Sequence, residues 1–249
     1  MSLEILPVSG LPEVRPGDDL ASLLIAGLEA SGLTAADGDV LVVTQKVVSK
    51  AEGRVVPVGE GGKAAWVARE TRRIVARRGD LVIAETRHGF VCANAGVDAS
   101  NVDDGFLTLL PVDPDASADA LRSAVEAATG ARVAVVITDT FGRPWRQGLV
   151  NVAIGCSGLP ALIDLRGTKD AGGRVLDVTM VALADEIAAA SGLVMGKAEG
   201  IPAAIVRGVP AEGPPLPATA LIRPPEEDLF PYSPVSDHLD AARPTGDAR

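Results

Sequence analysis

Two oxygen-bearing side chains, Asp139 and Thr140, directly follow the most strand-like run of the chain, Arg132 to Thr138. In α/β sheets, ligands gather at the carboxyl ends of strands. A carboxylate and a hydroxyl are hard oxygen donors that suit Mg²⁺ or Mn²⁺. An aspartate in this place could equally begin a turn or cap the next segment. The sequence therefore makes Asp139 a candidate ligand for a metal or a phosphate.

A second acidic side chain, Asp98, stands in a run of small residues from Ala95 to Val102 that also contains Asn101. Small residues let the backbone approach a ligand closely. Composition alone favours an ordinary Asx turn, in which the carboxylate bonds the backbone nearby. Asp98 is thus a second candidate ligand, on a weaker signal than Asp139.

Two lysines, Lys46 and Lys50, follow a second β-branched run, Asp39 to Thr44. Lysine acts on a phosphate as a mobile point charge. The GxxxxGK[ST] pattern of a Walker A loop is absent from the sequence. Because solvated lysines are common at strand ends, these two alone indicate a phosphate site only weakly.

Two glycine-containing loops complete the candidates. Gly10 to Val14 is a glycine–proline loop before the first expected helix, and Met195 to Gly200 places charged residues between glycines. Either loop could line a nucleotide. Either could also be a plain surface connection.

The sequence gives little support to covalent catalysis. Its histidines, His88 and His238, are far apart, and no GxSxG elbow is present. His88 could meet an anionic substrate, but we interpret it as a turn residue. Cys92 and Cys156 form no CxxC pair and have apolar neighbours, so we expect them to pack as small hydrophobic side chains.

Helical and strand-like segments alternate around these candidates, which predicts an α/β or α+β fold with mixed sheets and packed helices. Capping residues and glycine stops support several of the helices. We expect helices over residues 18–32, 63–78, 117–130 and 181–191, and strands over 39–44, 80–84, 90–93, 132–138 and 203–206.

Composition excludes several classes of protein. The 249 residues carry a formal charge of −10, which disfavours sequence-independent binding of nucleic acid. Hydrophobic residues make up 47%, too many for a disordered chain, yet no apolar run approaches the ~18 residues of a membrane span. Met1 to Glu4 shows no signal-peptide character, so we expect a cytoplasmic protein without membrane or nucleic-acid partners.

The chain changes character toward its end. Proline becomes frequent from Pro210 onward, and Ser236 to Arg249 has little apolar content. We therefore expect one folded domain over residues 1–230 and a flexible tail over 231–249.

Five segments, named at the end of this paragraph in their order along the chain, resemble segments of the coenzyme F420-0:γ-glutamyl ligase family. The resemblance covers residues 4–230. That family includes free-standing archaeal enzymes and the N-terminal ligase domain of two-domain actinobacterial proteins. Residues 223–230 resemble the linker into the flavin-binding domain of the latter, so a single-domain ligase and part of a two-domain protein both remain open. The matching segments are Gly10–Val14, Val43–Lys50, Arg87–Gly89, Ala95–Val102 and Thr138–Arg143.

The resemblance implies a GTP-dependent ligase that attaches L-glutamate to the lactyl carboxylate of F420-0 through an acyl phosphate. Further γ-linked glutamates, release of GDP and phosphate, and a homodimer are part of the same expectation. The implied cofactors are two divalent cations, Mg²⁺ or Mn²⁺, with K⁺ as a further candidate ion.

The resemblance also assigns roles to residues of this chain. Asp98 and Asp139 would hold one cation and Thr140 a second, with Asp98, Asp139 and Lys50 serving catalysis. The implied nucleotide contacts are Leu11, Pro12, Glu13, Val14, Gln45, Lys50, Asn101, Met195, Gly196, Lys197 and Glu199.

Two residues depart from the expected pattern. Gln45 stands where a serine is expected, although an amide can replace a hydroxyl as a donor. Lys197 stands near an expected second-metal ligand that is sometimes acidic, and lysine is a poor ligand. These departures motivate one alternative, a nucleotide- and metal-binding relative without catalysis. Another alternative is a ligase that acts on a different acceptor.

Overall fold

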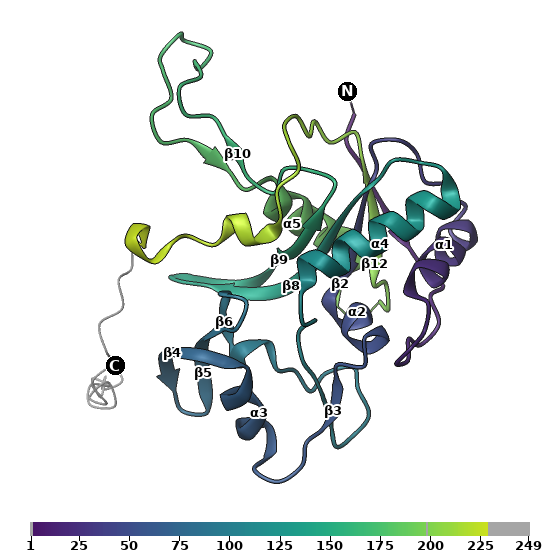
Figure 1. Ribbon diagram of the computed structural model, residues 1–249, viewed down its shortest axis with the longest axis vertical. Helices are drawn as coiled ribbons and strands as arrows, with labels where there is room; N and C mark the ends of the chain where they lie inside the picture. Colours follow the sequence, from purple (N-terminus) through teal and green to yellow (C-terminus); the bar gives the residue numbers. More distant parts are fainter. Residues whose placement is uncertain (1, 198, 229–249) are drawn as a thin grey trace, which may run out of the picture.

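The computed structural model describes residues 2–197 and 199–228 (Figure 1). The expected tail, residues 231–249, lies outside the described residues. Helices and several sheets are mixed in the described part, which confirms the expected α/β content. Within this part no helix is both long and apolar enough to cross a membrane.

A five-stranded sheet with the order β1-β12-β2-β8-β9 forms the centre of the molecule. Strands β2 and β8 run parallel, and every other neighbouring pair in this sheet is antiparallel. The expected strands over 39–44, 132–138 and 203–206 are confirmed. The bounds of the sheet are β1 (Glu4–Val8), β2 (Val40–Thr44), β8 (Ala134–Arg143), β9 (Arg146–Ser157) and β12 (Ala203–Arg207).

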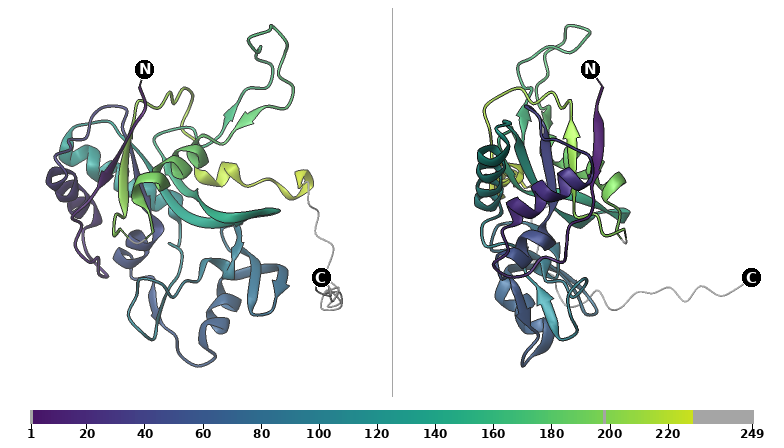
Figure 2. Two further views of the ribbon diagram at one scale, coloured as in Figure 1. Left: turned by 180° about the vertical axis from the view of Figure 1, so that it is seen from behind. Right: turned by 90° about the vertical axis from the view of Figure 1, so that its right-hand side faces the viewer.

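Helices cover both faces of this sheet (Figures 1 and 2). Successive residues of a strand point to opposite faces. Leu41 and Val43 of β2 therefore pack with α1 (Leu20–Ala30) and α4 (Pro114–Thr129), whereas the alternate valines of β2 pack with α5 (Leu183–Met195). Burial on both sides explains why the strand reads as a continuous apolar run.

A smaller group of elements lies below the central sheet in Figure 1. It has a separate apolar core, in which Val67 packs with residues of neighbouring strands and loops. Its elements are β3 (Val55–Pro57), α3 (Gly62–Glu70), β4 (Thr71–Arg78), β5 (Leu81–Thr86), β6 (Val91–Ala93) and β7 (Phe106–Thr108).

The expected helix over residues 63–78 is wrong in its second half. The helix ends at Glu70, and the chain continues as β4, which pairs with β5. The Thr71 hydroxyl donates to the carbonyl of Val67 at 2.6 Å and closes the last turn. Ile74 and Val75 are β-branched and suit a strand. Pairing with β5 therefore decides the secondary structure of this segment, although the spacing of its apolar residues also fits a helix.

Other differences concern where elements begin and which ones exist. The sequence predicts Ser117 as the cap of the helix over 117–130, but the helix begins earlier, at Pro114, because Asp113 caps it and proline suits the first turn. Further strands and one short helix were not expected from the sequence. These are β1, β3, β7, β9, the two-residue strands β10 (Ile163–Asp164) and β11 (Met180–Val181), and the helix α2 (Gln45–Ala51).

The hairpin of β8 and β9 contains a bulge. Ile137 pairs with Gly155, but the next residue, Thr138, pairs with Ala153, so Ile154 is an extra residue in β9. β8 also continues to Arg143, beyond the end that the sequence predicts. Asp139 consequently lies inside a strand, and the alternative that it begins a turn is wrong.

An ion pair between the buried carboxylate of Asp39 and the partly exposed side chain of Arg207 ties β12 to the start of β2. Asp39 is 1% exposed, and its two carboxylate oxygens each accept a hydrogen bond from Arg207 at 2.8 Å. The backbone amide of Ala36 donates to the same carboxylate at 2.9 Å. Removing one partner of such a pair leaves a buried charge only partly compensated.

We expect Arg207→Met to lower the free energy of unfolding by about 2–3 kcal/mol, because Asp39 would lose its charged partner. Urea denaturation followed by circular dichroism measures this. Arg132→Met is the matched control, since the pair of Arg132 with Asp37 is exposed and solvent screens it, so its loss should change the stability much less. Equal losses in the two variants would contradict this account of the Asp39 pair.

Candidate functional site

A cavity of about 770 Å³ lies where β2 ends beside the middle of β8. The two strands are parallel, and Thr44, the last residue of β2, lies beside Thr138 there. The loop before α1, helix α2, the loop after β6 and the loop after α5 complete the wall. The volume is typical of sites for small ligands.

The cavity brings together thirteen of the fourteen candidate residues from the sequence. Glu199 is the exception, since it is not part of the wall; its carboxylate accepts a hydrogen bond from the backbone amide of Lys197 at 2.7 Å. The candidates that line the cavity are Leu11, Pro12, Glu13, Val14, Gln45, Lys50, Asp98, Asn101, Asp139, Thr140, Met195, Gly196 and Lys197.

The loop from Leu11 to Val14 forms one rim of the cavity. Val14 is buried, whereas Pro12 and Glu13 are exposed. Gly27 of α1 allows this loop to pack closely, because a Cβ at that position would lie 2.5 Å from Cδ1 of Leu11. The rim is therefore held against α1 while its polar face stays open.

Helix α2 begins directly after β2 and places Lys46 and Lys50 one turn apart on the cavity wall. The ammonium of Lys50 bonds the carboxylate of Glu13 across the rim. Gln45 is 1% exposed, and its side-chain oxygen accepts a hydrogen bond from the Ser49 hydroxyl at 2.8 Å. The departure at Gln45 thus places an amide in the wall, with its oxygen already bonded inside the helix.

Asp98 combines the two roles that the sequence left open. Its carboxylate accepts a hydrogen bond from the Ser100 amide at 3.0 Å, as in an Asx turn, and it also borders the cavity. Lys46 reaches the other carboxylate oxygen at 2.7 Å. Burial alone would raise the pKa of Asp98, but the hydrogen bonds from Lys46 and Ser100 hold it below its ordinary value.

Asp139 is in the opposite electrostatic condition. Its pKa is raised from 3.8 to about 6, chiefly by burial and in part by repulsion from Asp98, against a hydrogen bond from the Thr140 amide. The positive charges of Lys46 and Lys197 lower it only in part. Its negative charge is therefore incompletely compensated in the protein without ligands.

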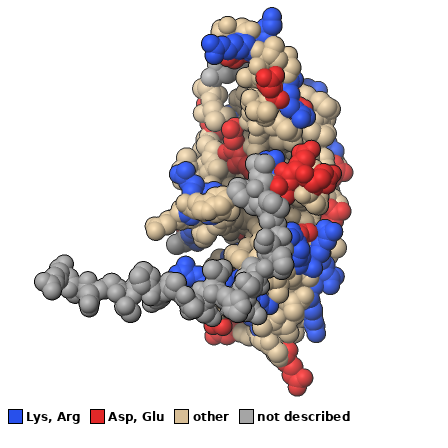
Figure 3. Space-filling model, turned by 90° about the vertical axis from the view of Figure 1, so that its left-hand side faces the viewer, with Lys and Arg blue, Asp and Glu red and all other residues tan. Residues whose placement is uncertain are grey.

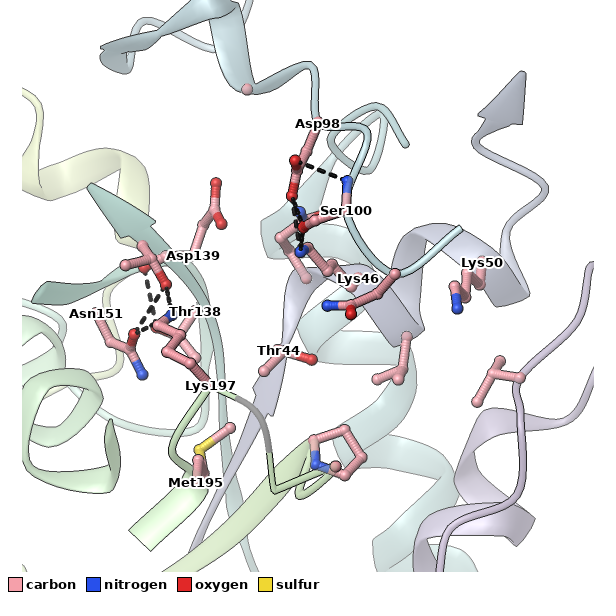
Figure 4. A pocket seen from close by; sticks show the side chains of 18 of the residues that line it. Thr44, Lys46, Lys50, Asp98, Ser100, Thr138, Asp139, Asn151, Met195 and Lys197 are labelled. Carbon is pink, nitrogen blue, oxygen red and sulfur yellow. Dashed lines mark hydrogen bonds and ion pairs between the residues drawn. The ribbon is translucent and has the colours of Figure 1, made fainter. Parts of the chain in front are cut away.

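Thr140 belongs to a separate cluster beside Asp139. Its hydroxyl donates to the side-chain oxygen of Asn151 at 3.0 Å, and the ammonium of Lys197 bonds the same hydroxyl. In Figure 4, Asn151 and Lys197 lie on one side of the cavity, and Asp98, Ser100 and Lys46 form a second group on the other. Burial lowers the pKa of Lys197, although Asp139 and Asp98 oppose that effect.

Sequence reasoning missed Asn151, which lies on β9 and pairs with Thr140 across the hairpin. It also left Lys46 and Ser100 outside the final candidates, although both stand in segments that it singled out. Predicting β9 would have provided the missing signal, because Asn151 is the amide that faces Thr140 from the neighbouring strand.

Asp98 and Asp139 both border the cavity. Among the described residues, no group of three or more His, Cys, Asp or Glu side chains could hold a metal ion. Asp98 and Asp139 nevertheless repel one another, and this repulsion adds to the effect of burial, which raises the pKa of Asp139. A divalent cation between like charges offsets such repulsion.

A second cavity, of about 1060 Å³, lies near residues 219–228, toward the face seen in Figure 3. That face carries both acidic and basic side chains. His88 lines this cavity, and its Nε2 atom is 2.9 Å from the carbonyl oxygen of Pro111. The contact supports the interpretation of His88 as a turn residue that ties two loops together.

The two aspartates should affect the stability of the metal-free protein in opposite directions. The folded protein holds the Asp139 proton more tightly than the unfolded chain, so stability falls as the pH rises from 3.8 through about 6, by at most about 3 kcal/mol. Asp139→Asn should therefore raise the melting temperature by a few degrees above pH 6 in EDTA. Asp98→Asn should lower it, because the depressed pKa of Asp98 contributes stability above its unfolded value. Thermal melts from pH 4 to 8 test this, and a fall for Asp139→Asn at pH 7.5 would contradict it.

Comparison with known proteins connects this geometry to a family. The family model described as F420-0:Gamma-glutamyl ligase matches residues 10–208. The chain is 44% identical to the Coenzyme F420:L-glutamate ligase of Methanothermobacter thermautotrophicus, over 92% of this chain and 99% of that protein. It is 45% identical to the protein of the same name from Methanopyrus kandleri, over 92% and 98%, and 43% identical to that from Archaeoglobus fulgidus, over 86% and 90%. The chain belongs to the F420-0:gamma-glutamyl ligase family, as its five ordered motifs predict.

Proposed function

We propose that this protein is a GTP-dependent ligase that joins L-glutamate to the lactyl carboxylate of coenzyme F420-0 and then adds further γ-linked glutamates. The names of its relatives support the acceptor and the amino acid. The observation that carries the proposal is the cavity, which joins the Leu11–Val14 loop, Lys50, Asp98 and Asp139 in one wall.

The chemistry explains why such a cavity needs both lysines and acids. A carboxylate is a poor electrophile, so the γ-phosphoryl group of GTP must first convert it into an acyl phosphate. Phosphoryl transfer places negative charge on the phosphate oxygens, which positive groups must neutralise. Lys50 and Lys46 provide mobile charges on one side of the cavity. A Mg²⁺ or Mn²⁺ ion held by Asp98 and Asp139 would supply charge neutralisation and orientation of the phosphates.

The ion pairs of the ligand-free protein fit these roles. Lys50 is largely buried and bonds the exposed carboxylate of Glu13, so a phosphate can replace that partner without moving the lysine far. Lys46 bonds Asp98, and a cation at Asp98 would release this lysine toward an anionic ligand. The carboxylates therefore hold lysines in place before the nucleotide binds.

Direct attack of the amine on the acyl phosphate suits the side chains present. Burial raises the pKa of both Cys92 and Cys156 to about 12, so neither thiol is a ready nucleophile. The glutamate amine then displaces phosphate and forms the amide bond. The leaving phosphate or a basic group accepts the proton of the amine.

The assembly and compartment belong to the same proposal. We place the protein in the cytoplasm as a homodimer, with K⁺ as a further candidate ion. Trp145 and Leu149, at the tip of the β8–β9 hairpin, are 81% and 67% exposed. A second copy of the chain would remove these apolar side chains from water.

The direct test is incubation with GTP, Mn²⁺, L-glutamate and F420-0, followed by mass spectrometry. We expect products heavier by one or more glutamyl units, with one GDP released for each unit. Asp139→Asn should retain the fold and lose metal-dependent turnover, because the amide cannot provide an anionic ligand. Full activity of this variant would contradict the role of Asp139.

Two other outcomes of this assay favour the alternatives. Nucleotide binding without any product would favour a non-catalytic relative. GDP release or amide formation with another phospholactyl-type acceptor, and none with F420-0, would favour a ligase with a different acceptor.

Lys50→Ala should raise the Michaelis constant for GTP about tenfold to hundredfold, through the loss of one charge-assisted hydrogen bond to phosphate. Steady-state kinetics with GTP as the varied substrate measures this. Lys169→Ala is the matched control, because Lys169 is exposed in the excursion between β10 and β11. An unchanged constant in Lys50→Ala would place this lysine outside the phosphate site.

A further inference from the structure

The cluster around Thr140 does not fit the second divalent cation that the family resemblance implies. The ammonium of Lys197 already bonds the Thr140 hydroxyl and lies 3.5 Å from the side-chain oxygen of Asn151. Both oxygens are neutral, whereas divalent cations of this kind are held mainly by carboxylates. A divalent ion placed at Thr140 would also be repelled by the ammonium.

We propose that the Lys197 ammonium replaces the second divalent cation, so that the chain works with one divalent ion, held by Asp98 and Asp139. This inference rests on the proposed function, because it concerns the charges that face the GTP phosphates. In this role the Lys197 ammonium supplies the positive charge on the Thr140 side of the cavity.

The hairpin geometry separates the two positions. Asp139 and Thr140 are consecutive residues of β8, so their side chains point to opposite faces of the strand. Thr140 accordingly pairs with Asn151, while Asp139 interacts with Asp98. The charge of Asp139 acts on both Asp98 and Lys197, whereas the Thr140 hydroxyl is hydrogen-bonded to Asn151 and Lys197.

The surroundings of Lys197 hold it in this place. Its backbone amide donates to the carboxylate of Glu199 at 2.7 Å, which shapes the loop after α5. Gly192 of α5 lets Asn151 approach the helix, because a Cβ there would lie 3.1 Å from Nδ2 of Asn151. Asn151 is 8% exposed and thus offers its oxygen to Lys197 from a nearly buried position. Lys197 is thus the charged member of a hydrogen-bonded cluster with Thr140 and Asn151.

The number of manganese ions bound per nucleotide tests this proposal. Wild-type protein, in molar excess over guanosine 5′-(β,γ-imido)triphosphate, would be titrated with Mn²⁺ and counted by equilibrium dialysis. We expect one bound Mn²⁺ per nucleotide and the sharp six-line electron paramagnetic resonance spectrum of an isolated ion. Two bound ions, or the broadened spectrum of a coupled pair, would overturn the proposal.

Substitutions of Lys197 give an independent readout. Lys197→Glu removes the ammonium and adds a carboxylate beside Thr140, so we expect it to bind a second Mn²⁺. Lys197→Met should still bind one ion, with turnover reduced about tenfold or more, while Lys197→Arg should restore part of that turnover. Circular dichroism checks the fold of each variant. A second ion absent from a folded Lys197→Glu, or full turnover in Lys197→Met, would contradict the proposal.

The result separates this inference from the proposed function. Two Mn²⁺ ions in a wild-type protein that makes glutamyl products would reject the role of Lys197 and leave the ligase activity established. Absence of Mn²⁺ and of products together would reject both.

Discussion

The parallel pairing of β2 with β8 is the constraint on which the site depends. Parallel strands run in the same direction, so the segment that follows β2 lies beside the residues of β8 that follow Thr138. Helix α2 follows Thr44 without an intervening loop, and Asp139 follows Thr138 within the same strand. Lys46 of α2 therefore interacts electrostatically with Asp139 of β8, although the two residues lie far apart in the sequence. Apolar packing on both faces of the two strands stabilises this arrangement.

Although the chain is acidic, several lysines gather in the cavity where we propose that the nucleotide binds. The net charge is −10, yet Lys46, Lys50, Lys63 and Lys197 all line the same cavity. Three of them bond oxygen acceptors within its wall or rim. These contacts limit the repulsion among the lysines before a ligand arrives. They also mean that binding exchanges one set of ion pairs for another, so its salt dependence should be smaller than the number of lysines suggests.

The sequence was informative where one local pattern decides the structure. The apolar runs over 39–44 and 132–138 predict strands, and acidic or basic residues directly after them predict a site at one sheet edge. Prediction from the sequence failed where contacts with residues distant in the chain decide the structure. Thr71, Ile74 and Val75 fit helical spacing until β5 pairs with them as a strand. The segment of β9 mixes glycine, polar and apolar residues, so neither the strand nor the place of Asn151 could be predicted. The contact of Lys197 with Thr140 also depends on how a glycine-flanked loop folds back.

The bulge in β9 links the apolar core to the identity of the groups beside Thr140. Without the bulge, continuous pairing from Ile137 with Gly155 would set Val152 opposite Thr140, and a methyl-bearing side chain would replace the amide of Asn151. Ile154 itself is buried in the core on the α1 and α4 side of the sheet. Insertions and deletions in this strand are therefore not neutral changes of length. An insertion or deletion that shifts the register of β9 by one residue would turn each of its side chains to the opposite face of the sheet. The polarity of the side chains that β9 contributes to the cavity wall would change with it.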